Sequence, residues 1–416
     1  MTLGLLSGYR VLDLTDHRGL LAGHVLARLG ADVIQVEPPG GSPTRSLLQG
    51  VGGTSWLWTA YAAGKRSVTC DLDSERGREL FARLAMTADF LIESDDVGAM
   101  DGRKLGWPWL RSVNPGGIHV SITGFGSDGP KAAYAESDLI VWAAGGPLFA
   151  NRDGDSPPLR ITVPQTYLHA AMDAAGGALV ALFARHASGQ GQHVDISAQQ
   201  SVAQASLSSV LASAVGDDNF SVFDMPLKRK KTLDLSGSGA RTRRSKWLAA
   251  DGLVELHLAM GPAGWSTNNL FAWMRDEGAL PDHLAEWDWK LVPQRIEAGE
   301  IEDADLENVR DVIAAFLAPR TKRQIHEQGM ARRITVAPIA TTRDLLDSAH
   351  FQERRVFEQV STRQGAVELP ARFAASDGFV PLKPAPLVGE HNREVYEGLP
   401  GLDGGALRDL VREGVI

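Results

Sequence analysis

Short apolar segments alternate with helical patterns through the first third of the chain, and this alternation limits the folds available to it. Arg10 to Thr15 and Asp32 to Glu37 have the apolar, β-branched character of buried strands, with a helical spacing between them at Leu20 to Leu29. Because helices that connect successive parallel strands cover both faces of a sheet, the pattern predicts an α/β protein with a mostly parallel sheet. The other predicted elements are strands at Ser67 to Leu72, Asp89 to Glu93 and Ile118 to Thr123, and a helix at Ser74 to Met86.

A long helix is predicted from about Leu168 to Ala187, where apolar residues recur at helical intervals along one face. The sequence SGQGQ, Ser188 to Gln192, follows it and supplies glycines that can end a helix. The next segment, His193 to Ser197, alternates like a strand. The middle of the chain therefore continues the helix–strand pattern of the first part.

A change in amino-acid composition suggests where a second domain begins. Residues 216–244 are polar, basic and rich in Gly and Ser, which is typical of a linker. Strands around a turn and then several helices follow, before Val336 to Leu346 restores a strand–helix unit. We therefore expect a large domain whose second part comes from the C-terminal end of the chain. The predicted boundaries are 1–215 and 331–416 for the large domain, 216–245 for the linker and 246–330 for a smaller α+β domain.

Composition excludes several classes of function. The 416 residues carry a net charge of −9, which argues against a nucleic-acid partner. The single cysteine, Cys70, cannot form an internal disulfide, and no Cys/His cluster has the spacing of a metal site. The N-terminal sequence lacks the features of a secretory signal, and no stretch approaches the roughly 20 apolar residues of a membrane span. We expect a cytoplasmic protein without a metal.

Two basic segments near predicted strands are candidates for binding an anion. In EPPGGSPTR, Glu37 to Arg45, the glycines would let backbone N–H groups approach an anion, and Arg45 could hold a phosphate with two donors. The alternative is a Pro/Gly turn that carries a surface arginine. Lys65 and Arg66 precede another predicted strand, and a solvated surface pair is the alternative for them.

Three further positions have both a functional and a structural interpretation. The glycines of TGFGSDGP, Thr123 to Pro130, suit close approach to a ligand and suit a tight loop equally well. Asp138 stands directly before an apolar run, where an Asp often caps the start of a helix. His169 lies on the predicted long helix, where a packing histidine is the alternative to a catalytic base.

Together these segments resemble the class III CoA-transferases, the family of formyl-CoA transferase, carnitine CoA-transferase and α-methylacyl-CoA racemase. The resemblance follows family order along nearly the whole chain. The matching segments are RVLDLT, LAGHVLARLGADVIQVEPPGGSPTR, YAAGKRSVTCDL, ADFLIES, VNPGGIHVSITGFGSDGP, LVALFARHASGQGQHVDIS, VAPIATTRDLL and LVGEHNREVYEGL.

This resemblance implies a Rossmann-like large domain built from both chain ends, a small domain near residues 225–330, and two subunits interlocked as linked rings. It also implies that CoA or an acyl-CoA is a substrate and that no cofactor is bound permanently. The residues that it places at the CoA groove are Arg45, Lys65, and Gly124 and Gly126 of the glycine loop, with Lys104 and Leu105 near the nucleotide end.

The chain departs from the family at the position of the catalytic residue. Family transferases use an Asp carboxylate as the nucleophile that accepts the acyl group, and counting back from SGQGQ places this position at Tyr167. A phenol with a pKa of about 10 stays protonated at neutral pH and cannot easily replace it. Asp173 is the nearest downstream acid but lies nearly two helical turns away. Asp138 matches an acidic family position in the preceding helix and is the best carboxylate left.

Three hypotheses remain open. The first is a heteromeric CoA-transferase in which a homologous subunit carries the nucleophilic Asp, since succinyl-CoA:(R)-benzylsuccinate CoA-transferase has two related subunits. The second is a self-sufficient transferase that uses Asp138 or transfers CoA directly between substrates. The third is a protein that binds CoA thioesters without turnover, or a racemase-like or isomerase-like enzyme that uses His169 with Tyr167.

Overall fold

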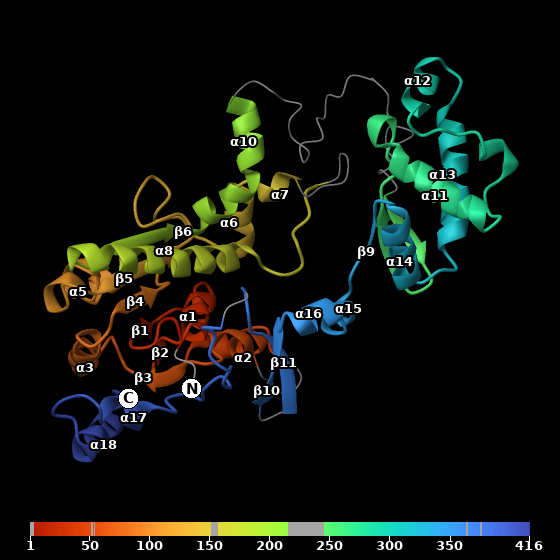
Figure 1. The fold of residues 1–416 in the computed structure, drawn as a ribbon. Coiled ribbons are helices and arrows are strands. Elements are labelled where there is room, and N and C mark those ends of the chain that lie inside the picture. The colour runs from red at the N-terminus through yellow and green to blue at the C-terminus, as the bar shows by residue number, and fades with distance from the viewer. Residues whose placement is uncertain are drawn as a thin grey trace. The chain divides into compact units, whose positions relative to one another are not determined.

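The computed structural model describes residues 4–50, 53, 55–150, 157–214, 245–362, 365–374 and 377–416. These fall into two compact units, shown in Figure 1. The first unit contains the described residues of 4–150, 157–214 and 349–416. The second unit contains residues 245–348. The predicted linker, 216–245, lies outside the described residues except for Ser245.

The first unit is built on a six-stranded sheet in the order β3-β2-β1-β4-β5-β6, in which every neighbouring pair is parallel. Its buried strands are rich in Val, Ile and Leu, as expected where helices cover both faces. The predicted α/β class with a parallel sheet is confirmed. The strands are β1 Arg10–Asp13, β2 Asp32–Glu37, β3 Arg66–Thr69, β4 Phe90–Glu93, β5 Ile118–Thr123 and β6 His193–Ser197.

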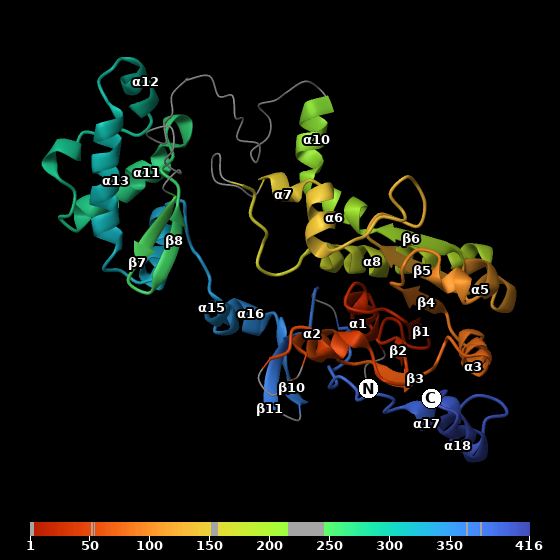
Figure 2. The same cartoon turned by 180° about the vertical axis from the view of Figure 1, so that it is seen from behind.

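Helices pack on both faces of this sheet, as the two opposite views in Figures 1 and 2 show. One core lies under α1 (Leu20–Arg28) and α8 (Thr166–Ser188). The other core lies under α3, α5, α17 and α18, and the last two of these come from the C-terminal part of the chain. Both ends of the chain therefore build one unit, as expected. The other helices of this unit are α2 Trp56–Tyr61, α3 Glu75–Ala85, α4 Ala99–Gly102, α5 Trp107–Val113, α6 Asp138–Ala144, α7 Pro147–Ala150, α9 Ala198–Ala203, α10 Leu207–Ala214, α16 Ala349–Glu353, α17 Asn392–Tyr396 and α18 Gly404–Arg412.

The C-terminal segment covers the outer edge of β3, the last strand of the sheet. The His391 N–H donates to the Ser67 carbonyl at 2.9 Å, and the Thr69 N–H donates to the Asn392 side-chain oxygen at 2.8 Å. The Tyr396 hydroxyl donates to the Thr69 carbonyl at 2.7 Å. These bonds satisfy backbone groups that an edge strand would otherwise expose. A hairpin of β10 (Phe357–Thr362) and β11 (Gly365–Pro370) precedes this segment.

The second unit contains a three-stranded antiparallel sheet in the order β7-β8-β9, packed against helices around buried Trp273 and Trp289. We predicted that the chain returns to the large domain at residue 331. Instead β9 pairs with β8, and the second unit extends to Ser348. Its elements are β7 Lys246–Ala249, β8 Gly252–Leu256, β9 Val336–Pro338, α11 Trp265–Asp276, α12 Val292–Glu297, α13 Asp303–Leu317, α14 Lys322–Arg332 and α15 Thr342–Leu346.

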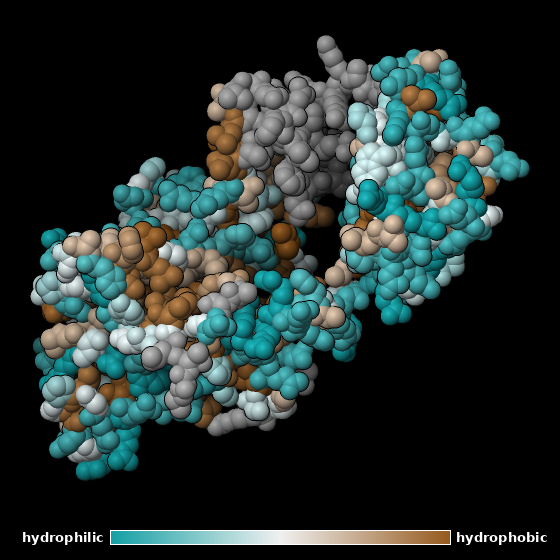
Figure 3. All heavy atoms as spheres, in the orientation of Figure 1, coloured by the Kyte–Doolittle hydropathy of each residue, from teal (hydrophilic) through white to brown (hydrophobic). Residues whose placement is uncertain are grey.

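The long helix α8 is the one predicted from the apolar spacing, and Gly189 ends it in a left-handed conformation with φ 68°. With 23 residues it is long and apolar enough to cross a membrane by length and composition, contrary to the sequence-based expectation. Its alanine-rich inner face nevertheless packs in the core of the first unit. Its outer face leaves Val180 70% and Phe183 82% exposed. Figure 3 shows hydrophobic surface in the region that α8 occupies in Figure 1.

A buried ion pair joins the first three strands in sequence. Lys65, directly before β3, lies 2.7 Å from the Asp13 carboxylate at the end of β1, and both side chains are fully buried. The Lys65 ammonium also donates to the Leu20 carbonyl at 2.8 Å and to the Gln35 side chain of β2 at 3.0 Å. All three of its donors are therefore used inside the protein.

Gly191, in the SGQGQ segment, permits close contact between β5 and β6. A Cβ atom at this position would lie 1.9 Å from the Gly117 carbonyl oxygen, which belongs to the backbone and cannot rotate away. We therefore predict that Gly191→Ala lowers the free energy of unfolding by about 2–3 kcal/mol in urea denaturation. Gly176→Ala is the matched control, because this glycine lies on α8 with open space around it. It should raise stability by about 0.5–1 kcal/mol. Equal effects of the two substitutions would refute this account of Gly191.

His24, on α1, should make stability depend on pH. Burial, and then the nearby Lys65 charge, lower the pKa of His24 to about 4, although its hydrogen bond to the Ala63 carbonyl opposes the shift. Below pH 6.5 the unfolded chain gains a proton that the folded protein does not, so stability falls as the pH falls towards 4. Between pH 7 and pH 5 the wild type should lose about 2 kcal/mol more than His24→Gln. His326→Gln, at an exposed position of α14, should behave like the wild type, and an unchanged loss in His24→Gln would contradict the assignment.

Candidate active site

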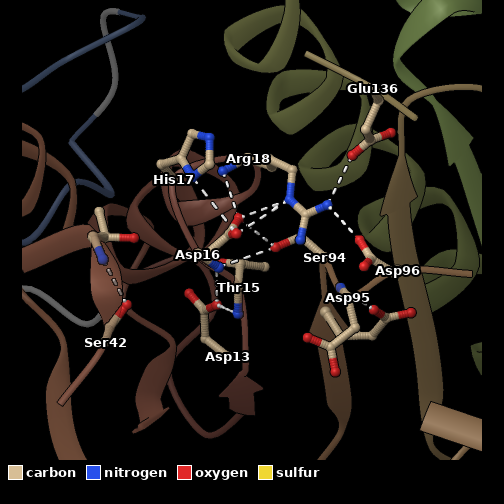
Figure 4. A network of polar contacts seen from close by, with 12 residues as sticks. Asp13, Thr15, Asp16, His17, Arg18, Ser42, Ser94, Asp95, Asp96 and Glu136 are labelled. Atoms are coloured by element: carbon tan, nitrogen blue, oxygen red, sulfur yellow. Dashed lines mark hydrogen bonds and ion pairs between the residues drawn. The ribbon is translucent and has the colours of Figure 1, made fainter. Parts of the chain in front are cut away.

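The candidate active site lies at the carboxyl ends of β1 and β4, the neighbouring strands at which the strand order reverses. Open α/β sheets bind their ligands beside this point. The chain after β1 contributes Asp16, His17 and Arg18, and the chain after β4 contributes Ser94 and Asp96. Figure 4 shows these side chains turned towards one another, with Arg18 at their centre.

Arg18 binds three carboxylates. Its Nε lies 3.1 Å and 3.2 Å from the two Asp16 oxygens, and its Nη1 lies 2.8 Å from Glu136 and 3.3 Å from Asp96. The Ser94 hydroxyl donates to Asp16 at 2.9 Å and fixes that carboxylate. Burial alone would raise the pKa of Asp16, but the bonds from His17 and Arg18 outweigh it and hold the pKa well below its usual range. Asp16 is therefore ionised at neutral pH.

Tyr167 lies beside this cluster, at the start of α8. Its side chain is buried, and its hydroxyl interacts with Glu136. Burial first, and then the negative charge of Glu136, raise the pKa of Tyr167 above the usual value for tyrosine. The phenol therefore stays protonated at neutral pH and is a poor nucleophile. The edge of its ring faces His17, with the ring centroids 6.0 Å apart.

Sequence reasoning missed Glu136, which precedes Asp138 by two residues. A Cβ atom at Gly124 would lie only 2.0 Å from Glu136 Oε2, so glycine at the end of β5 makes room for this carboxylate. Gly124 therefore serves the site, although by accommodating a side chain of the same protein rather than a ligand. The Glu-x-Asp spacing in AESDL was the available signal, but the match of Asp138 to an acidic family position drew the prediction to that residue.

Asp138 is close to Tyr167, as the resemblance implies, but its carboxylate is already in use. Its Oδ1 accepts the Thr166 N–H at 2.9 Å, and the Thr166 hydroxyl donates to the Asp138 carbonyl at 2.9 Å. Asp138 thus fixes the start of α8, while Ser137 caps α6. His169 points elsewhere: it is exposed and lies near Trp142, with ring centroids 6.1 Å apart.

Arg45 and Lys65 bind groups of the protein itself. Arg45 donates to both oxygens of Glu37 at 2.6 Å and 2.7 Å, donates to the Pro386 carbonyl at 3.1 Å, and stacks 3.7 Å above the Trp58 ring. Lys65 has no donor left after its buried contacts. The geometry therefore does not support Lys65 as a CoA ligand, and it gives Arg45 the structural role of joining β2 to the C-terminal segment.

The remaining predicted CoA residues differ in exposure. Leu105 packs its side chain in the core and is only 2% exposed, so it offers a ligand no side-chain surface. Lys104 is exposed and adopts a left-handed conformation with φ 62°. Gly126 also has positive φ, 93°, and its N–H binds the Thr123 hydroxyl at 3.0 Å, which folds the glycine loop tightly over the end of β5. Lys104 and this loop remain proposals for CoA contacts.

Comparison with known proteins places the chain in one family. Residues 6–392 match the family described as CoA-transferase family III. The chain is 28% identical to a formyl-CoA:oxalate CoA-transferase of Streptomyces avermitilis, over 99% of both chains. It is 31% identical to the succinyl-CoA:(R)-benzylsuccinate CoA-transferase subunit BbsE of Thauera aromatica, over 99% of this chain and 98% of that one. A crystal structure of a CAIB/BAIF family protein from Brucella suis aligns with a TM-score of 0.74 and 26% identity, covering 95% of this chain and 99% of the other. The chain belongs to CoA-transferase family III and is a CoA-transferase.

Proposed function

We propose that the chain is one subunit of a heteromeric enzyme that moves CoA between an acyl-CoA thioester and a free carboxylic acid. In this enzyme, the present chain is the subunit without the nucleophilic Asp. The observation that carries this proposal is the buried, protonated Tyr167 at the position where the family resemblance implies that Asp. A homologous subunit would then supply the attacking carboxylate. CoA and its thioesters are substrates, and the enzyme holds no permanent cofactor. The enzyme works in the cytoplasm, and its subunits are intertwined.

Two further observations support a partner. One relative that matches nearly full length is itself named as a subunit, BbsE. The outer face of α8 also exposes large apolar side chains to water, since Val180 is 70% and Phe183 is 82% exposed. Such exposed apolar surface is typical of a contact with another protein. A homologous chain that covered this face would remove both side chains from water.

A self-sufficient transferase is the second candidate, and the two carboxylates next to Tyr167 favour it. Asp138 is bound to the start of α8, and Glu136 is bound to Arg18. Each would have to leave its present partner, at least in part, to attack a thioester. The racemase-like alternative has less support, because His169 is exposed and the pKa of Tyr167 is raised rather than lowered.

A CoA-exchange assay distinguishes these arrangements. The purified chain is tested alone and together with a co-expressed homologue that carries Asp at the position of Tyr167. We predict exchange only in the combined sample, and we predict that Tyr167→Phe keeps that exchange within about twofold, because the phenol does not react. Activity of the chain alone that is lost in Asp138→Asn or Glu136→Gln, with an acyl adduct on that residue by mass spectrometry, would favour the second candidate.

The partner surface has a separate test. We predict that Phe183→Lys weakens association with the homologue at least about tenfold, because it places a charge in an apolar contact. Met330→Lys is the control: this side chain is also exposed and apolar, but it lies on α14 of the second unit. Analytical ultracentrifugation or co-purification measures both. Equal association of the two variants would rule out the outer face of α8 as the contact.

A further inference from the structure

We infer that the acyl site beside Tyr167 accepts acyl groups without a second carboxylate and discriminates against dicarboxylic acids. This inference rests on the proposed function, in which the homologous subunit supplies the carboxylate that attacks an acyl group held beside Tyr167, and it names the class of acid. The named acids of two relatives, oxalate and benzylsuccinate, are dicarboxylic. The side chains around Tyr167 point to a different preference in this chain.

The first argument is the charge of the site. Arg18 brings one positive charge, and Asp16, Asp96 and Glu136 bring three negative charges, so the cluster carries 3 − 1 = 2 net negative charges. Asp138 adds another carboxylate at the start of α8. Two unit charges 4 Å apart interact by about 4 kcal/mol near a protein surface, so an additional substrate carboxylate in this position is repelled.

The second argument is that the neighbouring cations are already paired. Lys65 is buried against Asp13, and Arg45 binds both oxygens of Glu37. Arg103 binds Asp95 at 2.6 Å and Asp73 at 2.7 Å. Lys65, Arg45 and Arg103 each have a carboxylate partner, so none of these three cations has an unpaired charge for a substrate. The exposed Lys131 lies over the Phe125 ring instead, 5.9 Å from its centroid.

The raised pKa of Tyr167 is also consistent with a negative electrostatic potential at its hydroxyl. Burial raises the pKa of the Tyr167 hydroxyl first, and the charges of Glu136 and Asp16 raise it further, against the opposing effect of Arg18. Negative charge at the hydroxyl is therefore disfavoured. A second carboxylate of a bound acid would meet the same field.

Exposed apolar side chains also lie close in sequence to Asp138 and Tyr167. Leu139 and Ile140 follow Asp138 on α6 and are 43% and 49% exposed, and Val163, three residues before Thr166, is 58% exposed. Such side chains can contact the body of an uncharged acyl group, which gains free energy when its own apolar surface leaves water. Acid repulsion and apolar contact thus favour the same substrates, apolar monocarboxylic acids.

The test compares acids matched in size. Each acyl-CoA is incubated with its own isotopically labelled free acid, and transfer of label into the thioester is measured for the active preparation of the wild type. The pairs are butyrate with succinate, and 2-benzylbutyrate with benzylsuccinate. We expect kcat/KM at least about tenfold higher for the monocarboxylic member of each pair. Equal or faster exchange of the dicarboxylic members would overturn the inference and leave the transferase proposal standing. Absence of exchange with all four acids would overturn both.

Charge-neutral variants separate electrostatics from shape. Asp96 is 90% exposed, so Asp96→Asn should not affect folding, and it is tested alone and together with Glu136→Gln. Each removed charge should raise the ratio of dicarboxylic to monocarboxylic exchange, by at least about tenfold in the double variant. Glu79→Gln, at an exposed position of α3, is the matched control and should leave the ratio unchanged. An increase from about 0.1 M to about 1 M salt should raise the ratio in the wild type as well, and an unchanged ratio in the variants would refute a role for the site's charge.

Discussion

The buried ion pair between Asp13 and Lys65 is the interaction on which the site depends. It crosses three strands, and its cost of desolvation is offset only because every donor of the ammonium is satisfied. The other Asp13 oxygen accepts the Thr15 N–H at 2.9 Å and the Thr15 hydroxyl at 2.6 Å. This fixes the chain as it leaves β1, three residues before Arg18. A charge pair that no ligand touches thereby determines where the guanidinium at the centre of the site lies.

Much of the fold could be predicted from local patterns. The strands of the parallel sheet are buried on both faces, so their apolar runs are continuous, and the glycine that ends α8 is a local signal. The return of the chain to the first unit was misplaced, because the pairing of β9 with β8 joins residues far apart in sequence. The contacts of Arg45 and Lys65 within the protein could not be predicted either. Lys65 meets Asp13 only through the pairing of strands that are far apart in sequence. Glu37 stands in the same segment as Arg45, but a glycine-rich turn does not reveal whether its arginine binds this carboxylate or a ligand.

The site combines the framework of the family with a buried tyrosine surrounded by carboxylates. Tyr167 occupies the start of α8, yet the neighbourhood remains rich in carboxylates, and the nearest one, Glu136, is held by Arg18 and accommodated by Gly124. A comparison limited to position 167 identifies the tyrosine and overlooks the carboxylates around it. Glu136 could not be ranked from sequence, because its contact with Tyr167 is formed by segments that meet only in the folded chain.

The cover over the outer edge of β3 has a consequence for synthesis on the ribosome. The groups that satisfy Ser67 and Thr69 come from the segment around His391 and Asn392, near the end of the chain. While translation proceeds, the strand has an open edge that can pair with a strand of another nascent polypeptide. The edge of β3 is covered only after the segment around His391 has been synthesised, whereas the second unit has all of its residues earlier. The smaller unit can therefore fold before the larger one is complete, and during this interval the open edge of β3 is the part of the sheet that a chaperone would protect.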